Sequence, residues 1–175
     1  MTLSYRRLLS TALLVPALAL AATGCVSEAP PSGTATATSA PAGEEASTFA
    51  VTDAWVKATD EGMTGAFGVL SNSGDRDIQV IGATSDAAGM VELHEVVEND
   101  DGEMTMREKT GGFLIPAGSE HTLEPGADHV MLMQLTDPLE AGDEVTITLS
   151  FADGSTADVT ATVKDFSGAN ETYEG

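Results

Sequence analysis

The stretch from His94 to Met133 holds the side chains best suited to binding chemistry. It contains all three histidines and four of the seven methionines, one of the seven being the initiator. The side chains that could act together are His94, His129, Met104, Met106, Met131 and Met133. A thioether sulfur is a soft, uncharged donor and imidazole is a borderline one, so this combination suits copper, especially Cu(I). Methionine also fills irregular hydrophobic cores readily, so the residue types alone leave both uses open.

The spacing of these residues indicates that strands position them. Alternate residues of a strand project to the same face, about 6.5–7 Å apart. His129 and Met131 therefore point the same way, and Met104 and Met106 share a face of another strand. Two such pairs on neighbouring strands could hold one ion.

A hairpin would bring the pairs together. The turn-forming residues Asn99–Gly102 separate the strand of His94 from that of Met106, which predicts such a hairpin. The alternative is that Met131 and Met133 form one apolar face of a strand and serve only for packing.

Cysteine and enzyme motifs limit the other possibilities. Cys25 is the only cysteine, so the chain has no internal disulfide, and blue-copper sites, which need a Cys beside two His, are excluded. No nucleophile elbow, phosphate-binding glycine loop or His-Glu-x-x-His motif occurs, and we expect no enzyme. His121 is expected to be a solvated strand residue and Trp55 a core anchor near the first strand.

The N-terminus has the organisation of an export signal. Arg6 and Arg7 precede an apolar run and then small residues, a pattern typical of a secretory signal peptide and too short for a membrane span. The motif Ala22-Thr23-Gly24-Cys25 resembles a bacterial lipobox. We predict a signal peptide over residues 1–24 and a lipid on Cys25, which would anchor the protein to the outer face of the bacterial cell membrane. The alternative is ordinary signal cleavage that leaves a free thiol.

The mature chain is strongly acidic. Without Arg6 and Arg7, five of the seven Lys and Arg remain against 28 Asp and Glu, a formal charge of −23. Such a surface repels nucleic acid and anionic lipid headgroups and favours solubility. We therefore expect no nucleic-acid partner.

Composition divides the rest into a tether and one domain. Residues 25–47 are rich in Ser, Thr, Ala and Pro and predict a disordered linker after the anchored Cys25. Residues 48–166 predict one all-β domain, an antiparallel Greek-key sandwich or barrel, and residues 167–175 a flexible tail. Turn residues delimit ten strands: Phe49–Ala58, Gly65–Asn72, Ile78–Ser85, Val91–Val97, Met104–Lys109, Phe113–Ile115, His121–Leu123, His129–Leu135, Glu144–Phe151 and Thr156–Val163.

Several short motifs resemble the PCuAC family of extracytoplasmic copper chaperones. The resemblance extends over about residues 51–163 and is specific at seven places. These are Asp53–Thr59, Val91–Glu95, Met104–Arg107, Ile115–Gly118, Leu123–Gly126, His129–Met133 and Pro138–Asp143. The resemblance implies a cupredoxin-like β-sandwich that binds Cu(I) through two histidines and two methionines.

The family pattern places the ligands at four positions of this chain. They are His94, Met106, His129 and Met131, with Met104 in reserve. The resemblance also implies delivery of copper to an accepting protein, in this family a subunit or assembly factor of cytochrome c oxidase. A non-metal adhesion or ligand-binding module and a copper sequestration protein remain the alternatives.

The chain departs from the family pattern in three respects. Glu95 stands where many members have Met, and the interval between Met106 and His129 is one residue longer, with the extra residue near Gly111-Gly112. The chain also lacks the His/Met-rich C-terminal tail of some members, which favours a single principal site.

Overall fold

All ten predicted strands are present, with ends that differ by a few residues. The computed structural model describes residues 43–99, 101–168 and 172–173, so the predicted signal peptide, Cys25 and most of the linker lie outside the described residues. The strands are β1 (Phe49–Lys57), β2 (Met63–Asn72), β3 (Ile78–Thr84), β4 (Ala88–Glu98), β5 (Met104–Glu108), β6 (Phe113–Ile115), β7 (Glu120–Leu123), β8 (His129–Leu135), β9 (Glu144–Phe151) and β10 (Thr156–Lys164). Among the described residues, no helix has the length and apolar character to cross a membrane.

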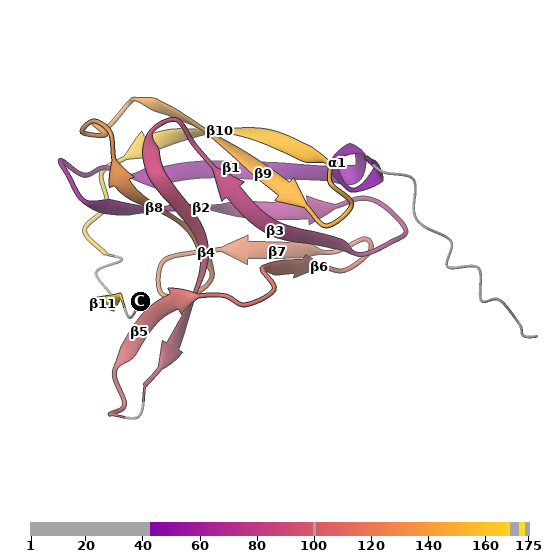
Figure 1. Ribbon diagram of the computed structural model, residues 1–175, viewed down its shortest axis with the longest axis horizontal. Coiled ribbons are helices and arrows are strands. Elements are labelled where there is room, and N and C mark those ends of the chain that lie inside the picture. The colour runs from indigo at the N-terminus through magenta and orange to yellow at the C-terminus, as the bar shows by residue number, and fades with distance from the viewer. Residues whose placement is uncertain (1–42, 100, 169–171, 174–175) are drawn as a thin grey trace, which may run out of the picture. The chain divides into compact units, whose positions relative to one another are not determined.

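The strands form one continuous ladder that builds a cupredoxin-like β-sandwich, which confirms the predicted fold class (Figure 1). With the short strand β11 (Thr172–Tyr173) included, the order is β11-β5-β4-β8-β2-β1-β10-β9-β3-β6, and β7 pairs with β2. The sheet is mixed rather than purely antiparallel, because β10 returns alongside β1 in the same direction, with Trp55 opposite Thr162. Such a pairing of the first and last long strands depends on contacts distant in sequence, which the local pattern does not contain.

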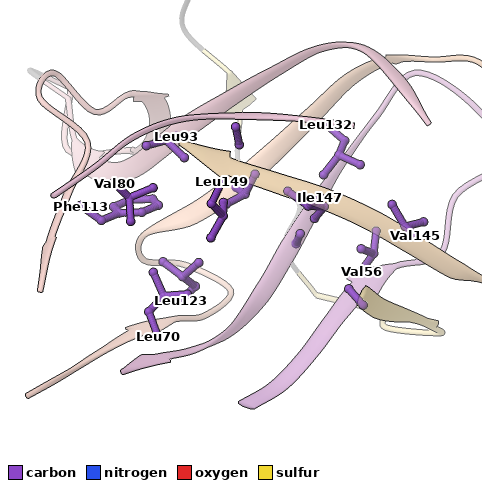
Figure 2. Close-up of a cluster of buried hydrophobic side chains, with 14 of the residues drawn as sticks. Val56, Leu70, Val80, Leu93, Phe113, Leu123, Leu132, Val145, Ile147 and Leu149 are labelled. Carbon is purple, nitrogen blue, oxygen red and sulfur yellow. The ribbon is translucent and has the colours of Figure 1, made fainter. Parts of the chain in front are cut away.

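Side chains from most strands of the ladder pack together in one hydrophobic core (Figure 2). Phe113, Leu132, Leu149 and Val56 are each almost fully buried in it and come from four different strands. Fully burying one such side chain contributes roughly 1.5–3 kcal/mol, so this core is the main source of stability.

Strand β8 is buried on both faces. Val130 and Leu132 lie in the main core, whereas Met131 and Met133 belong to a second, smaller cluster with Met106. Both faces of β8 are therefore apolar: one packs in the main core, and the other carries methionines of the second cluster. The second cluster lies on the face that carries His129.

The domain begins earlier than predicted, because a short helix precedes β1. Helix α1 (Glu44–Thr48) occupies the end of the predicted linker. The Asp153 carboxylate accepts hydrogen bonds from the backbone N–H groups of Gly43 and Glu45, while the Glu45 carboxylate accepts one from Asp153 N–H. Burial opposes ionisation of Asp153, but the hydrogen bonds from Ser155, Glu45 and Gly43 outweigh it and hold its pKa well below the ordinary value.

Part of the predicted flexible tail has strand geometry. Strand β11 (Thr172–Tyr173) pairs in parallel with β5, with Tyr173 opposite Met106. An edge strand such as β5 exposes a row of backbone hydrogen-bonding groups, which explains why polar residues can pair there without an apolar pattern.

The turn after β5 depends on a glycine that no other residue can replace without strain. Gly111 and Gly112 both have positive φ, 87° and 72°, but only a Cβ on Gly112 would meet the carbonyl oxygen of Val80, at 1.9 Å. We expect Gly111→Ala to cost about 1–2 kcal/mol from its backbone conformation alone. Gly112→Ala should cost about 2–5 kcal/mol, because backbone must also move to relieve the clash.

Chemical denaturation of the two matched variants measures this difference. Equal losses of unfolding free energy would contradict the close approach of Gly112 to β3.

Candidate metal centre

The two histidines expected to bind metal lie directly opposite each other. His94 of β4 pairs with His129 of β8 in the antiparallel ladder, so both side chains project from the same face. Their ring centroids are 5.5 Å apart at an interplanar angle of 70°. His94 is completely buried and His129 is nearly so. The register therefore holds two imidazoles side by side in a site sheltered from water.

The two methionines expected beside them lie on the same face. Met131 is two residues from His129 along β8, and Met106 is diagonal to His94 across the β4–β5 hairpin, where it pairs with Val96. Directly opposite and diagonal cross-strand neighbours are about 5–8 Å apart, within reach of a long thioether side chain. Met106 and Met131 are both buried and belong to the same small cluster.

A pocket gives access to this face. It has a volume of about 280 Å³, and His129, Met106 and Met131 line it together with Lys57 of β1, Met63 and other residues of β2, and two loop residues. Three of the four expected ligand side chains thus border one solvent-accessible space, and His94 lies buried beside His129.

Hydrogen bonds orient both imidazoles. His94 Nε2 is 2.9 Å from Glu92 Oε2, and His129 Nδ1 is 2.9 Å from the carbonyl oxygen of Ala127. A carboxylate and a carbonyl can only accept, so these contacts assign the proton to Nε2 of His94 and to Nδ1 of His129. The metal-binding lone pairs are then on His94 Nδ1 and His129 Nε2. Outer partners of this kind fix ring orientation and raise ligand basicity.

Aromatic side chains border the histidine pair. Phe67 lies 6.0 Å from His129 between ring centroids and packs on Trp55 at 4.6 Å. Trp55 in turn contacts Phe166, in the chain that follows β10. Trp55 is therefore half-buried in an aromatic group beside the site and is not one of the residues of the main core.

Two other residues singled out in the sequence lie away from the four. Met104 shares the face of Met106 but is exposed, near the end of the hairpin. His121 of β7 stacks on Phe113 and lies 3.0 Å from the Asp128 carboxylate. Within the described parts of the chain, no three His, Cys, Asp or Glu side chains gather as a metal site.

Two of the three departures from the family pattern, Glu95 and the longer interval near Gly111-Gly112, lie within the domain, and the structure shows the surroundings of both. Glu95 projects from the face opposite His94 and forms ion pairs with Arg107 and Lys109. The Gly111–Gly112 turn, near which we expect the extra residue, lies outside β4, β5 and β8. Neither departure alters the register that aligns the expected ligands.

Glu92 is the site residue that the sequence analysis missed. It lies two residues before His94 on the same strand face, and its carboxylate contacts the imidazole. Strand alternation would have identified it, because residues i and i−2 share a face.

Comparisons with known proteins agree with this architecture. Residues 49–163 match the family described as "Putative lipoprotein LpqE-like". The chain is 47% identical to "Putative lipoprotein Lxx21020" of Leifsonia xyli subsp. xyli, over the full length of both. The solution structure of CuI-DR1885 from Deinococcus radiodurans is 34% identical, with a TM-score of 0.52, covering 81% of this chain and 98% of that one. The copper-bound PCuAC domain from PmoF2 has the same fold, with 21% identity and a TM-score of 0.56 over 68% of this chain and 94% of that one. The resemblance to PCuAC proteins is therefore confirmed.

The ion pairs of Glu95 should make stability depend on pH. Hydrogen bonds from Lys109 and Arg107 lower the pKa of Glu95 below its ordinary 4.5, so the ionised carboxylate stabilises the fold above that pH and the contribution disappears as pH falls through the lowered value. The hydrogen bond that Lys109 donates to Glu95 raises the pKa of Lys109 above 10.5, so its share is present below that pH and is lost as pH rises further. Glu95→Gln should cost about 0.5–1 kcal/mol near pH 7.

Urea denaturation as a function of pH measures the effect. The cost of Glu95→Gln should shrink as pH falls from 4.5 through the lowered pKa of Glu95, because the wild-type carboxylate then becomes protonated as well. Glu98→Gln, an exposed carboxylate on the same strand, is the control and should have little effect at either pH.

Proposed function

This chain belongs to the LpqE-like lipoprotein family, and on that basis we propose that it is an extracytoplasmic copper chaperone that binds Cu(I) and delivers it to another protein. The single observation that carries the proposal is the pairing of His94 with His129 on the face that also bears Met106 and Met131. The Cu(I) form of the related DR1885 and the copper-bound PCuAC domain of PmoF2 support the choice of metal.

The proposed ligands are His94 Nδ1, His129 Nε2 and the sulfurs of Met106 and Met131. All four are neutral, so they suit Cu(I), and the soft thioethers disfavour hard cations. Glu92 orients His94 without entering the ligand set. Met104 stays in reserve because its exposed side chain lies at the outer end of the hairpin.

Delivery fits the same ligand set. Imidazole and thioether ligands lack the charge of a thiolate, so an acceptor that presents cysteines can take Cu(I) by exchanging ligands one at a time. The pocket exposes Met106, His129 and Met131 to such an acceptor. No catalytic turnover is required.

The anchor and the acceptor complete the proposal. Lipidation of Cys25 and the linker to about residue 42 would hold the domain at the outer face of the membrane, as expected for a lipoprotein family. The proposed acceptor is a copper-binding subunit of cytochrome c oxidase or one of its assembly factors, as the resemblance to PCuAC chaperones implies.

Competition with a colorimetric Cu(I) chelator tests the site. The wild-type chain should withdraw one equivalent of Cu(I), and His129→Gln with Met131→Leu should weaken binding by about 100-fold or more, since two of four ligands are lost. His121→Gln is the matched control and should bind like the wild type, because His121 lies on β7 against Phe113. Undiminished binding by the double variant would refute the ligand assignment, and no binding by the wild type would favour a non-metal adhesion role.

Transfer to a thiolate acceptor tests the chaperone role. The Cu(I)-loaded protein, mixed with a peptide carrying two cysteines, should lose its copper to the peptide, because thiolates bind Cu(I) more strongly than neutral ligands do. Gel filtration followed by metal analysis measures the distribution. Copper that stays on the protein in the presence of excess peptide would favour sequestration over delivery.

A further inference from the structure

A second group of methionines lies beside the proposed site, in a row that crosses three neighbouring strands. Met133 of β8 is directly opposite Met90 of β4 on one side and directly opposite Met63 of β2 on the other. Both pairings are antiparallel and in register, so the three side chains project from one face, the face that carries His129 and Met131. We call Met63, Met133 and Met90 the methionine row.

The exposure of the row differs from that of packing residues. Met133 is 4% exposed, whereas Met63 and Met90, which flank it, are 43% and 39% exposed. Met63 and Met90 therefore place flexible thioether side chains at the surface, on either side of the buried Met133. Directly opposite Cβ atoms are about 4.5–5.5 Å apart, and a methionine side chain has three rotatable bonds, so the three sulfurs can converge above Met133.

The distribution of methionine argues against simple core filling. Every methionine after the initiator lies on this one sheet face: Met63, Met90, Met104, Met106, Met131 and Met133. The main core, as far as the chain is described, consists of Val, Leu, Ile, Phe and Ala. Methionine used only as an adaptable filler would be expected in the main core as well.

The row is continuous with the proposed Cu(I) site. Met133 and Met131 are alternate residues of β8, about 6.5–7 Å apart along the strand, and both belong to the small cluster with Met106. Met63 lines the same pocket as His129 and Met131. An ion held by the row would lie two strand repeats from the histidines, with Met131 midway between Met133 and His129 on the same face.

We propose that Met63, Met133 and Met90 form a second binding site for Cu(I), a three-thioether site through which the ion enters or leaves the His94/His129 site. Three neutral, soft sulfurs select a soft monovalent cation such as Cu(I) or Ag(I) and offer little to Zn(II) or Cu(II). The row binds more weakly than the inner site because it lacks imidazole. The passage to the inner site rests on the proposed function, whereas binding by the row itself does not.

Titration with Ag(I), a redox-stable probe for Cu(I), tests this proposal. The full chain in detergent, with Cys25→Ser in every version so that no thiol contributes, is labelled at the methionine methyl groups for NMR. The wild type should bind two Ag(I) ions in sequence. The first should shift the methyl signals of Met106 and Met131, and the second those of Met63, Met90 and Met133.

Three variants separate the two sites. Met63→Leu with Met90→Leu should lose the second ion and keep the first, and both substitutions are at exposed positions where leucine leaves the fold intact. Ile81→Leu, at an exposed position of β3, a strand that carries none of the donors, is the control and should keep both ions. His129→Gln with Met131→Leu should lose the inner ion while the signals of the row still shift.

The outcomes distinguish failure of this inference from failure of the proposed function. A wild type that binds one ion with the row unshifted, or a Met63→Leu/Met90→Leu variant that still binds two, overturns the methionine row as a site and leaves the inner site standing. Shifts confined to the row, with none at Met106 or Met131, would support the row and refute the inner site. Zn(II) should shift none of the row's signals, and shifts equal to those caused by Ag(I) would overturn the assignment to soft cations.

Discussion

The register of β8 is the constraint on which both the core and the candidate metal centre depend. This strand pairs with β2 on one side and β4 on the other, and each of its faces is buried in a different cluster. Because side chains alternate along a strand, a slip of one residue would bring His129 and Met131 into the main core and turn Val130 and Leu132 towards the pocket. The hydrophobic effect that places Val130 and Leu132 thus also holds the soft donors on the opposite face.

Local sequence patterns predicted most of the fold because the strands are short and turn residues separate them clearly. The hairpin that brings His94 and Met106 together could also be predicted, since only residues 99–103 lie between its strands and the Asn99 side chain accepts hydrogen bonds from within the turn. The parallel pairing of β1 with β10 and the helix α1 could not. Both depend on partners more than a hundred residues away, such as the Asp153 carboxylate that accepts hydrogen bonds from Gly43 and Glu45.

The candidate site, like the fold, could be predicted where residues close in sequence form it, but not where strands distant in sequence come together. Alternation along β8 gave His129 with Met131, and the family pattern selected the four expected ligands. The methionine row escaped the sequence analysis because Met63 and Met90 are isolated residues on separate strands, and only the register reveals that both face Met133. Glu95 shows the converse: it follows His94 directly, yet lies on the other face in ion pairs with Arg107 and Lys109.

The arrangement of donors suggests how a protein can hold copper sheltered from water and still release it. Along this face the donors change from exposed thioethers at Met63 and Met90, through buried Met133 and Met131, to imidazoles of which His94 is fully buried. A Cu(I) ion moving inward exchanges one neutral ligand for another about one strand repeat away and never has to become a bare ion in a low-dielectric interior, which would be very costly. The same steps taken outward bring the ion to surface sulfurs that an acceptor's thiolates can displace. A buried Cu(I) ion could therefore still be exchanged, because neighbouring strands present their donor side chains in adjacent rows on one face.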